Sequence, residues 1–110
     1  MKQFHQYPYG LIGNCAFLAL VHKNTNIEWM CLPRFDSSFV FGRLVGGAEK
    51  GGEFSIMPES EDYISNQNYR YNTNILETEI NFGADAYKVT DFAPRYLQND
   101  RYYRPLMLIR

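Results

Sequence analysis

A short segment of the chain collects residue types that suit sugar binding. Residues 28–39 hold the only tryptophan, Trp29, followed by Arg34, Phe35 and Asp36 in a loop that a proline constrains. Aromatic rings stack on the aliphatic C–H faces of sugars, and a guanidinium offers a fork of hydrogen-bond donors. Rigid loops at strand ends often carry binding sites. The segment therefore predicts a substrate-binding site made by these four side chains.

The same residues also fit a purely structural interpretation. In that case Trp29 and Phe35 would lie in the core, and Arg34 would pair with Asp36. Ser37 would then cap a short helix. Both interpretations stay open at this point.

The acidic residues do not form a catalytic pair in the sequence. Glycoside hydrolysis uses two carboxyl groups across one bond, and the general acid needs surroundings that keep it protonated. The candidates are Glu28, Asp36, Glu77, Glu79 and Asp91. Glu77 and Glu79 share a polar, solvated strand face, and Asp91 stands at a strand end, where Asp commonly caps a turn. We therefore expect no catalytic residue here, and no activity from this chain alone.

Metal, thiol and phosphate chemistry are not indicated either. Cys15 and Cys31 lie inside apolar stretches, so we expect two reduced core thiols. His5 and His22 stand at no metal-ligand spacing from them. Because no glycine-rich loop precedes a helix, a phosphate cradle is unsupported. We expect no metal and no cofactor.

Length and charge limit the partners of the chain. Its 110 residues correspond to one small domain, and a net charge of -1 gives no reason to expect nucleic acid or an anionic membrane. No apolar run approaches the roughly 18 residues that span a bilayer. Residues 1–5 lack the features of a signal peptide. We expect a cytoplasmic protein without a nucleic-acid or membrane partner.

The pattern along the chain is a series of short β-strands separated by polar turns. Residues 15–22 are apolar on both faces, which is typical of a central strand, and residues 27–32 return as its hairpin partner. Residues 75–82 alternate with a period of two, and residues 86–92 pair back. Further strands are expected at residues 54–57, 63–71 and 105–110, with a short helix or strand at 39–45. Residues 1–110 are thus predicted to be all-β, as one antiparallel β-sandwich domain or a fragment of one.

Several strings resemble the opening of bacterial glycoside hydrolase family 15 proteins. They are residues 9–15, 19–21, 27–37, 74–78, 89–94 and 106–110. That family comprises glucoamylases, glucodextranases and trehalases, in which a longer, supersandwich-like β-domain precedes an (α/α)6 barrel. It usually has Asp at the position of Asn14. The resemblance implies that the catalytic glutamates lie in the barrel, no part of which is present in this sequence.

The resemblance implies a non-catalytic N-terminal accessory domain. It would support the catalytic barrel of a parent protein acting on α-linked glucosides, and would lend Arg34 and Asp36 to the rim of the sugar pocket. Two other functions stay open. One is a stand-alone carbohydrate-binding module that uses exposed Tyr and Trp side chains, and the other is a structural or oligomerisation domain.

Unpaired strand edges predict self-association of the isolated chain. The strand at residues 105–110 has no partner after it in the sequence, which is typical of a cut through a larger sheet. Leu106, Leu108 and residues 63–71 would then expose apolar side chains. Two copies could complete each other's sheets around a two-fold axis. We expect a dimer or a higher homo-oligomer.

Overall fold

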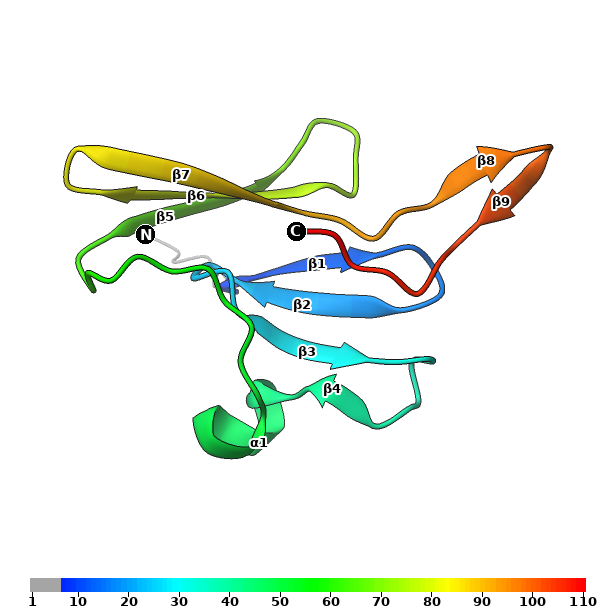
Figure 1. Ribbon diagram of the computed structural model, residues 1–110, viewed down its shortest axis with the longest axis horizontal. Helices are drawn as coiled ribbons and strands as arrows, with labels where there is room; N and C mark the ends of the chain where they lie inside the picture. The colour runs from blue at the N-terminus through cyan, green and yellow to red at the C-terminus, as the bar shows by residue number, and fades with distance from the viewer. Residues whose placement is uncertain (1–6) are drawn as a thin grey trace, which may run out of the picture.

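The computed structural model describes residues 7–110, apart from the side chains of residues 48 and 49, and confirms the all-β fold (Figure 1). Sheet A has the strand order β1-β2-β3-β4, sheet B the order β5-β6-β7, and β8 and β9 form a separate hairpin; all neighbours are antiparallel. The strands are β1 (Tyr9–Gly13), β2 (Leu18–His22), β3 (Ile27–Cys31), β4 (Phe39–Phe41), β5 (Ile64–Tyr69), β6 (Leu76–Phe82), β7 (Asp85–Asp91), β8 (Tyr96–Gln98) and β9 (Arg101–Tyr103). One short helix, α1 (Arg43–Lys50), follows β4 and is interrupted at Gly47.

The two sheets pack as layers around a small apolar core, with sheet B above β1 in Figure 1. Alternate residues of β1, β2 and β6 are buried, as the period of two predicts. Gly10 lets the layers approach closely, because a Cβ at this position would lie 2.6 Å from a methyl carbon of Leu76 on β6. The core residues are Ile12, Phe17, Ala19, Val21, Ile27, Met30, Leu76 and Ala93.

Side chains of sheet B cover the open edge of β1. The Tyr69 hydroxyl accepts a hydrogen bond from the Leu11 N–H at 2.8 Å and donates one to the Leu11 carbonyl at 2.6 Å. The Asn74 amide donates to the Gly13 carbonyl at 3.2 Å. Since these groups occupy the backbone positions that a further strand would use, the β1 edge is protected from pairing with another chain.

One buried ion pair joins three parts of the fold. Arg110 Nε lies 2.6 Å from Asp91 Oδ1 at the end of β7, and the side chains of the two residues are 4% and 0% exposed. The same guanidinium donates to the carbonyls of Phe54 and Thr25 and lies over the Phe54 ring, 4.7 Å from its centroid. The sequence-based expectation that Asp91 caps a turn is therefore wrong, because its carboxylate is used to neutralise Arg110.

Several predicted strands are confirmed, and others are not. The hairpin of residues 75–82 and 86–92 corresponds to β6 and β7, and residues 27–32 correspond to β3. Residues 54–57 are not a strand, because the Phe54 and Ile56 N–H groups donate to the side chains of Asn26 and Thr25. The Phe54 carbonyl accepts one backbone hydrogen bond from β3, from the Ile27 N–H. Residues 105–110 form a single β-bridge, between Ile109 and Phe92.

Two further differences concern the start of sheet A and the end of the chain. The central strand begins at Leu18 rather than at residue 15, because Cys15 has a positive φ of 74° and lies in the turn between β1 and β2. Cys15 is exposed, so the expectation of two core thiols is wrong for Cys15 and confirmed for the buried Cys31; both thiols are free. The strand β1 and the hairpin β8–β9 were not predicted.

Removing Arg110 should test the dependence of the fold on this ion pair. We expect Arg110→Met to lower the free energy of unfolding by about 3–5 kcal/mol, because Asp91 is then left buried without a counter-ion. Urea unfolding followed by the fluorescence of Trp29 measures the change. Arg104→Met, at an exposed arginine, is the control and should change the value by less than about 0.5 kcal/mol. Equal effects of the two substitutions would contradict the role assigned to Arg110.

Candidate functional site

The loop of residues 33–38 follows β3 and begins with a cis peptide bond between Leu32 and Pro33. Within it, Arg34 Nε lies 3.3 Å from Asp36 Oδ1, and both side chains are about three-quarters exposed, at 77% and 74%. Ser37 closes the turn, since its Oγ accepts from the Arg34 N–H and its N–H donates to the Arg34 carbonyl. The pairing of Arg34 with Asp36, expected from the structural interpretation, is thus present, but it lies in solvent. Ser37 closes this turn and does not cap a helix.

Trp29 and Phe35 lie on the outer face of sheet A. Trp29 is half-buried, and its ring centroid is 5.3 Å from that of Phe39 on β4. Phe35 is 54% exposed, so it is not a core residue. Together with Leu18 and Cys31, Trp29 and Phe35 line a hollow of about 150 Å³. This volume is below the roughly 300–1,000 Å³ of ligand pockets, and it suits a single protruding side chain better than a whole ligand.

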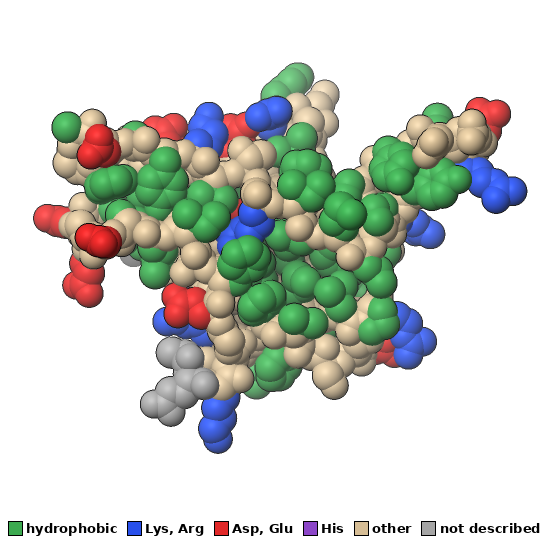
Figure 2. Space-filling view, viewed as in Figure 1, with side chains coloured by type: hydrophobic (Ala, Val, Ile, Leu, Met, Phe, Trp, Pro, Cys, Tyr) green, Lys and Arg blue, Asp and Glu red, His purple; other side chains and the backbone are tan. Residues whose placement is uncertain are grey.

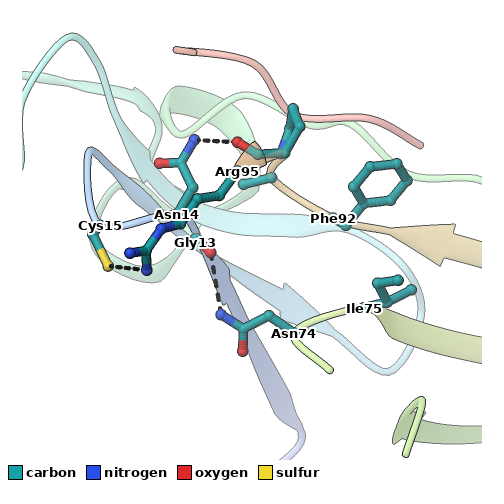
Figure 3. A pocket seen from close by; sticks show the side chains of 9 residues that line it. Gly13, Asn14, Cys15, Asn74, Ile75, Phe92 and Arg95 are labelled. Atoms are coloured by element: carbon teal, nitrogen blue, oxygen red, sulfur yellow. Dashed lines mark hydrogen bonds between the residues drawn. The ribbon is translucent and has the colours of Figure 1, made fainter. Parts of the chain in front are cut away.

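A larger hollow of about 480 Å³ lies at one end of the sandwich (Figure 3). Three segments line it: residues 13–15 at the end of β1, residues 74–75 before β6, and residues 92–95 after β7. All of these residues except Arg95 belong to strings that carry the family resemblance, and this shared origin is the signal by which the sequence could have indicated the hollow. Sequence reasoning did not predict it, because the three segments are far apart in the chain.

Hydrogen bonds join the walls of the larger hollow. The buried Asn14 amide donates to the carbonyls of Pro94 at 2.9 Å and Pro105 at 2.8 Å, while its oxygen accepts from the Ala16 N–H. Arg95 Nη1 lies 3.8 Å from the Cys15 sulfur, a contact that Figure 3 draws as a dashed line. The polar groups that line the hollow therefore bond mainly to one another. These bonds connect the end of β1 with the segment after β7.

Of the candidate carboxylates, Asp36, Glu77 and Asp91 have cationic partners, and Glu28 is 7% exposed on β3. Glu77 pairs with Arg70 at 2.7 Å and Lys88 at 3.2 Å on the outer face of sheet B. Hydrogen bonds from Arg70 and then Lys88 hold the pKa of Glu77 below its usual range. A general acid needs the opposite shift, and neither of the two hollows has an Asp or Glu in its lining.

The described part of the chain also bears on metal binding and membrane insertion. Among residues 7–110, no group of three or more His, Cys, Asp or Glu side chains is arranged to hold a metal ion. The helix found in that part is too short and too polar to cross a bilayer.

Comparison with known proteins then identifies the domain. Residues 8–106 match the family described as "Trehalase-like, N-terminal". The chain belongs to this family. The match covers the strands of both sheets and the loop that holds Arg34 and Asp36, so the predicted resemblance is confirmed. No solved structure matches the chain.

Curated relatives of this trehalase-like domain are much longer than the chain. The trehalase of Thermoplasma volcanium is 40% identical over 94 residues, which cover 84% of this chain and 14% of that protein. Trehalase 1 of Sulfolobus acidocaldarius is 38% identical over 87 residues, covering 79% and 15%. The trehalase of Thermoplasma acidophilum is 43% identical over 77 residues, covering 68% and 13%. The chain thus corresponds to a small part of each relative.

The amide of Asn14 gives a test of how the trehalase-like domain is held together. Asn14→Asp should lower the free energy of unfolding at neutral pH by about 1–3 kcal/mol, because a carboxylate cannot donate to the two proline carbonyls. Those carbonyl oxygens disfavour the charged form and raise the pKa of the new carboxyl in the folded state. The lost stability should therefore return as the pH falls through that raised pKa.

Urea unfolding from neutral to mildly acidic pH measures both effects. Asn74→Asp is the matched control, since Asn74 is exposed and donates one hydrogen bond, to Gly13. A deficit of Asn14→Asp that does not shrink on acidification would contradict the donor role of Asn14.

Proposed function

We propose that this chain is the non-catalytic N-terminal accessory domain of a trehalase-like glycoside hydrolase of family 15. Its partner would be a separate catalytic (α/α)6 barrel in the same protein. The observation that carries the proposal is the match of residues 8–106 to a trehalase-like N-terminal family, combined with relatives in which the aligned part is only 13–15% of the protein. Most of each relative therefore lies outside the segment that corresponds to this domain.

The state of the acidic side chains supports a non-catalytic role. Asp91 neutralises Arg110, Glu77 is held by Arg70 and Lys88, and Asp36 pairs with Arg34. A retaining or inverting glycosidase requires two carboxyl groups about 5–10 Å apart on either side of the scissile bond. We therefore assign catalysis to the partner domain and no catalytic residue to this chain.

The substrate would be an α-linked glucoside, and trehalose is the first candidate because the relatives are named trehalases. The loop with Trp29, Arg34, Phe35 and Asp36 is proposed to lie at the rim of the sugar pocket. Two features support this placement. The Arg34–Asp36 pair is exposed and contributes little to the fold, and exposed pairs of this kind are worth about 0–1 kcal/mol. Arg34 is therefore free to donate to a hydroxyl oxygen.

A cytoplasmic location is part of the same proposal. Cys15 and Cys31 are the two cysteines of the chain, and both are free thiols. Small secreted domains usually pair their cysteines, whereas the cytosol keeps thiols reduced.

A chimera tests the proposed function. The segment of the Thermoplasma volcanium trehalase that aligns with this chain is replaced by the chain, and glucose release from trehalose is measured. We expect the chimera to be active, while the isolated chain and the trehalase lacking the segment release no glucose above a heat-treated control. Activity of the isolated chain, or an inactive chimera that folds, would overturn the proposal.

Arg34→Ala in the active chimera tests the loop. Loss of one charged hydrogen bond to the sugar, about 1.5–3 kcal/mol, should lower kcat/KM by about 10–150-fold and leave the melting temperature nearly unchanged. Arg104→Ala is the matched control and should change neither. If Arg34→Ala lowers the melting temperature and leaves the kinetics of the folded enzyme unaltered, the loop is structural.

We propose that the isolated chain self-associates through an exposed apolar surface, where two segments run along the border of the two sheets. Figure 2 shows hydrophobic side chains gathered where residues 53–57 and the C-terminal segment run between sheets A and B. The exposed apolar residues of these two segments are Phe54, Ile56, Met57, Leu106, Met107 and Ile109. An apolar surface of this kind is a usual site of association. Leu108, which was expected to be exposed, instead packs against the core.

Sedimentation velocity at micromolar concentration measures this association. We expect a dimer or larger species, and Leu106→Glu should shift it toward monomer because a charge then faces the apolar surface. Leu97→Glu on β8, at a leucine of similar exposure, is the control. A chain that sediments as a monomer throughout would contradict the proposal.

A further inference from the structure

The outer faces of the two sheets differ in chemistry. On sheet A, the strand register places Leu11 opposite Leu20, and Leu20 opposite Trp29. The ring of Phe39 on β4 continues this row beside Trp29. The row therefore crosses all four strands of sheet A, and we name these four residues the outer stripe.

The corresponding face of sheet B is polar. Its register places Asn68 opposite Glu77 and Glu77 opposite Thr90, and the next outward row is Asn66, Glu79 and Lys88. A sheet face that meets water normally carries polar side chains, as sheet B does. The difference arises from the strand sequences, because β2 is apolar on both faces whereas β6 alternates.

Parts of the outer stripe remain accessible to solvent. Leu11 is 47% exposed and Phe39 is 40% exposed, and the stripe borders the hollow of about 150 Å³ that Leu18, Trp29, Cys31 and Phe35 line. The strands β1 and β2 carry no Lys, Arg, Asp or Glu, and β3 carries one such residue, Glu28, which is 7% exposed beside Trp29. An apolar row across a sheet, next to a recess that can hold one side chain, is typical of a protein–protein contact surface.

We propose that the outer stripe is the surface on which the remainder of a trehalase-like protein packs against this domain. This inference rests on the proposed function. The length outside the aligned segment, 85–87% of the relatives, provides the chain that would cover the stripe. Leu20 and Trp29 lie in strings that carry the family resemblance, although neither contributes to the core between the sheets. Packing on this stripe would also place the neighbouring loop of Arg34 and Asp36 at the border between the two domains.

Hydroxyl-radical footprinting with mass spectrometry tests the inference directly. Leu11 and Phe39 should be labelled several-fold less in the active chimera than in the isolated chain. Ile64 on the far sheet, which is 69% exposed, and the exposed Tyr71 should be labelled equally in both. A second arm needs no fused protein. The dilute isolated chain is mixed with the trehalase that lacks its aligned segment, and the labelling of Leu11 and Phe39 is compared with that in the isolated chain.

Substitution gives an independent measurement on the same surface. Leu11→Glu should lower the melting temperature and activity of the chimera and leave the melting temperature of the isolated chain nearly unchanged. Ile64→Glu, the same change at a more exposed apolar strand residue of sheet B, should affect neither.

The outcomes separate the two proposals. An active chimera in which Leu11 and Phe39 are labelled as in the isolated chain would overturn the inference and leave the proposed function standing. Protection that grows with the concentration of the isolated chain would assign the stripe to a second copy and would also overturn it. A folded but inactive chimera would count against the proposed function itself.

Discussion

Arg110 binds three segments that lie far apart in the sequence, and the packing of the two sheets depends on these contacts. Its guanidinium is shared among the carboxylate of Asp91 on β7, the Thr25 carbonyl in the β2–β3 turn, and the Phe54 carbonyl in residues 53–57. Burying a charge is costly unless it is paired and its remaining donors are used, and both conditions are met here. Thr25 has a positive φ of 75°, which is unusual for a β-branched residue, and contacts with residue 56 and Arg110 hold it there.

The polar ties between the layers explain how so small a core can hold the fold. Sheet B contributes the hydroxyl of Tyr69 and the amide of Asn74 to the edge of β1, while Asn14 joins the end of β1 to the segments around Pro94 and Pro105. Each of these bonds is directional, so together they fix the relative position of the layers, which apolar burial alone would leave less determined. The loop after β3 takes no part in this network, and this leaves its charged side chains in solvent.

Local patterns in the sequence predicted those elements whose partners are near in the chain. The β6–β7 hairpin follows from the alternation of residues 75–82 and a tight turn, because both strands are specified within a short window. The strand β1 was not predicted; it contains two glycines, a residue type depleted in strands, and its edge is completed by Tyr69, 58 residues away from Leu11. In the same way, the pattern of residues 54–57 predicts a strand, yet side chains from the β2–β3 turn bind two of their N–H groups and β3 donates one backbone hydrogen bond, to Phe54. Of the predicted site, Trp29 and Phe35 meet in one hollow, and Arg34 pairs with Asp36 beside it.

The strings that carry the family resemblance divide into two kinds when they are placed on the structure. Residues 9–15, 74–78, 89–94 and 106–110 meet inside the domain, where they form the larger hollow and the Arg110–Asp91 pair, so folding of this chain explains their chemistry. Residues 27–37 are different, because Trp29 and the Arg34–Asp36 pair lie outside the core to which Ile27 and Met30 of the same string belong. An apolar ring in that position lowers solubility, and an exposed ion pair adds little stability. Their chemistry is therefore not explained by folding of this chain, and the proposed contact with a covering domain and its substrate would account for it.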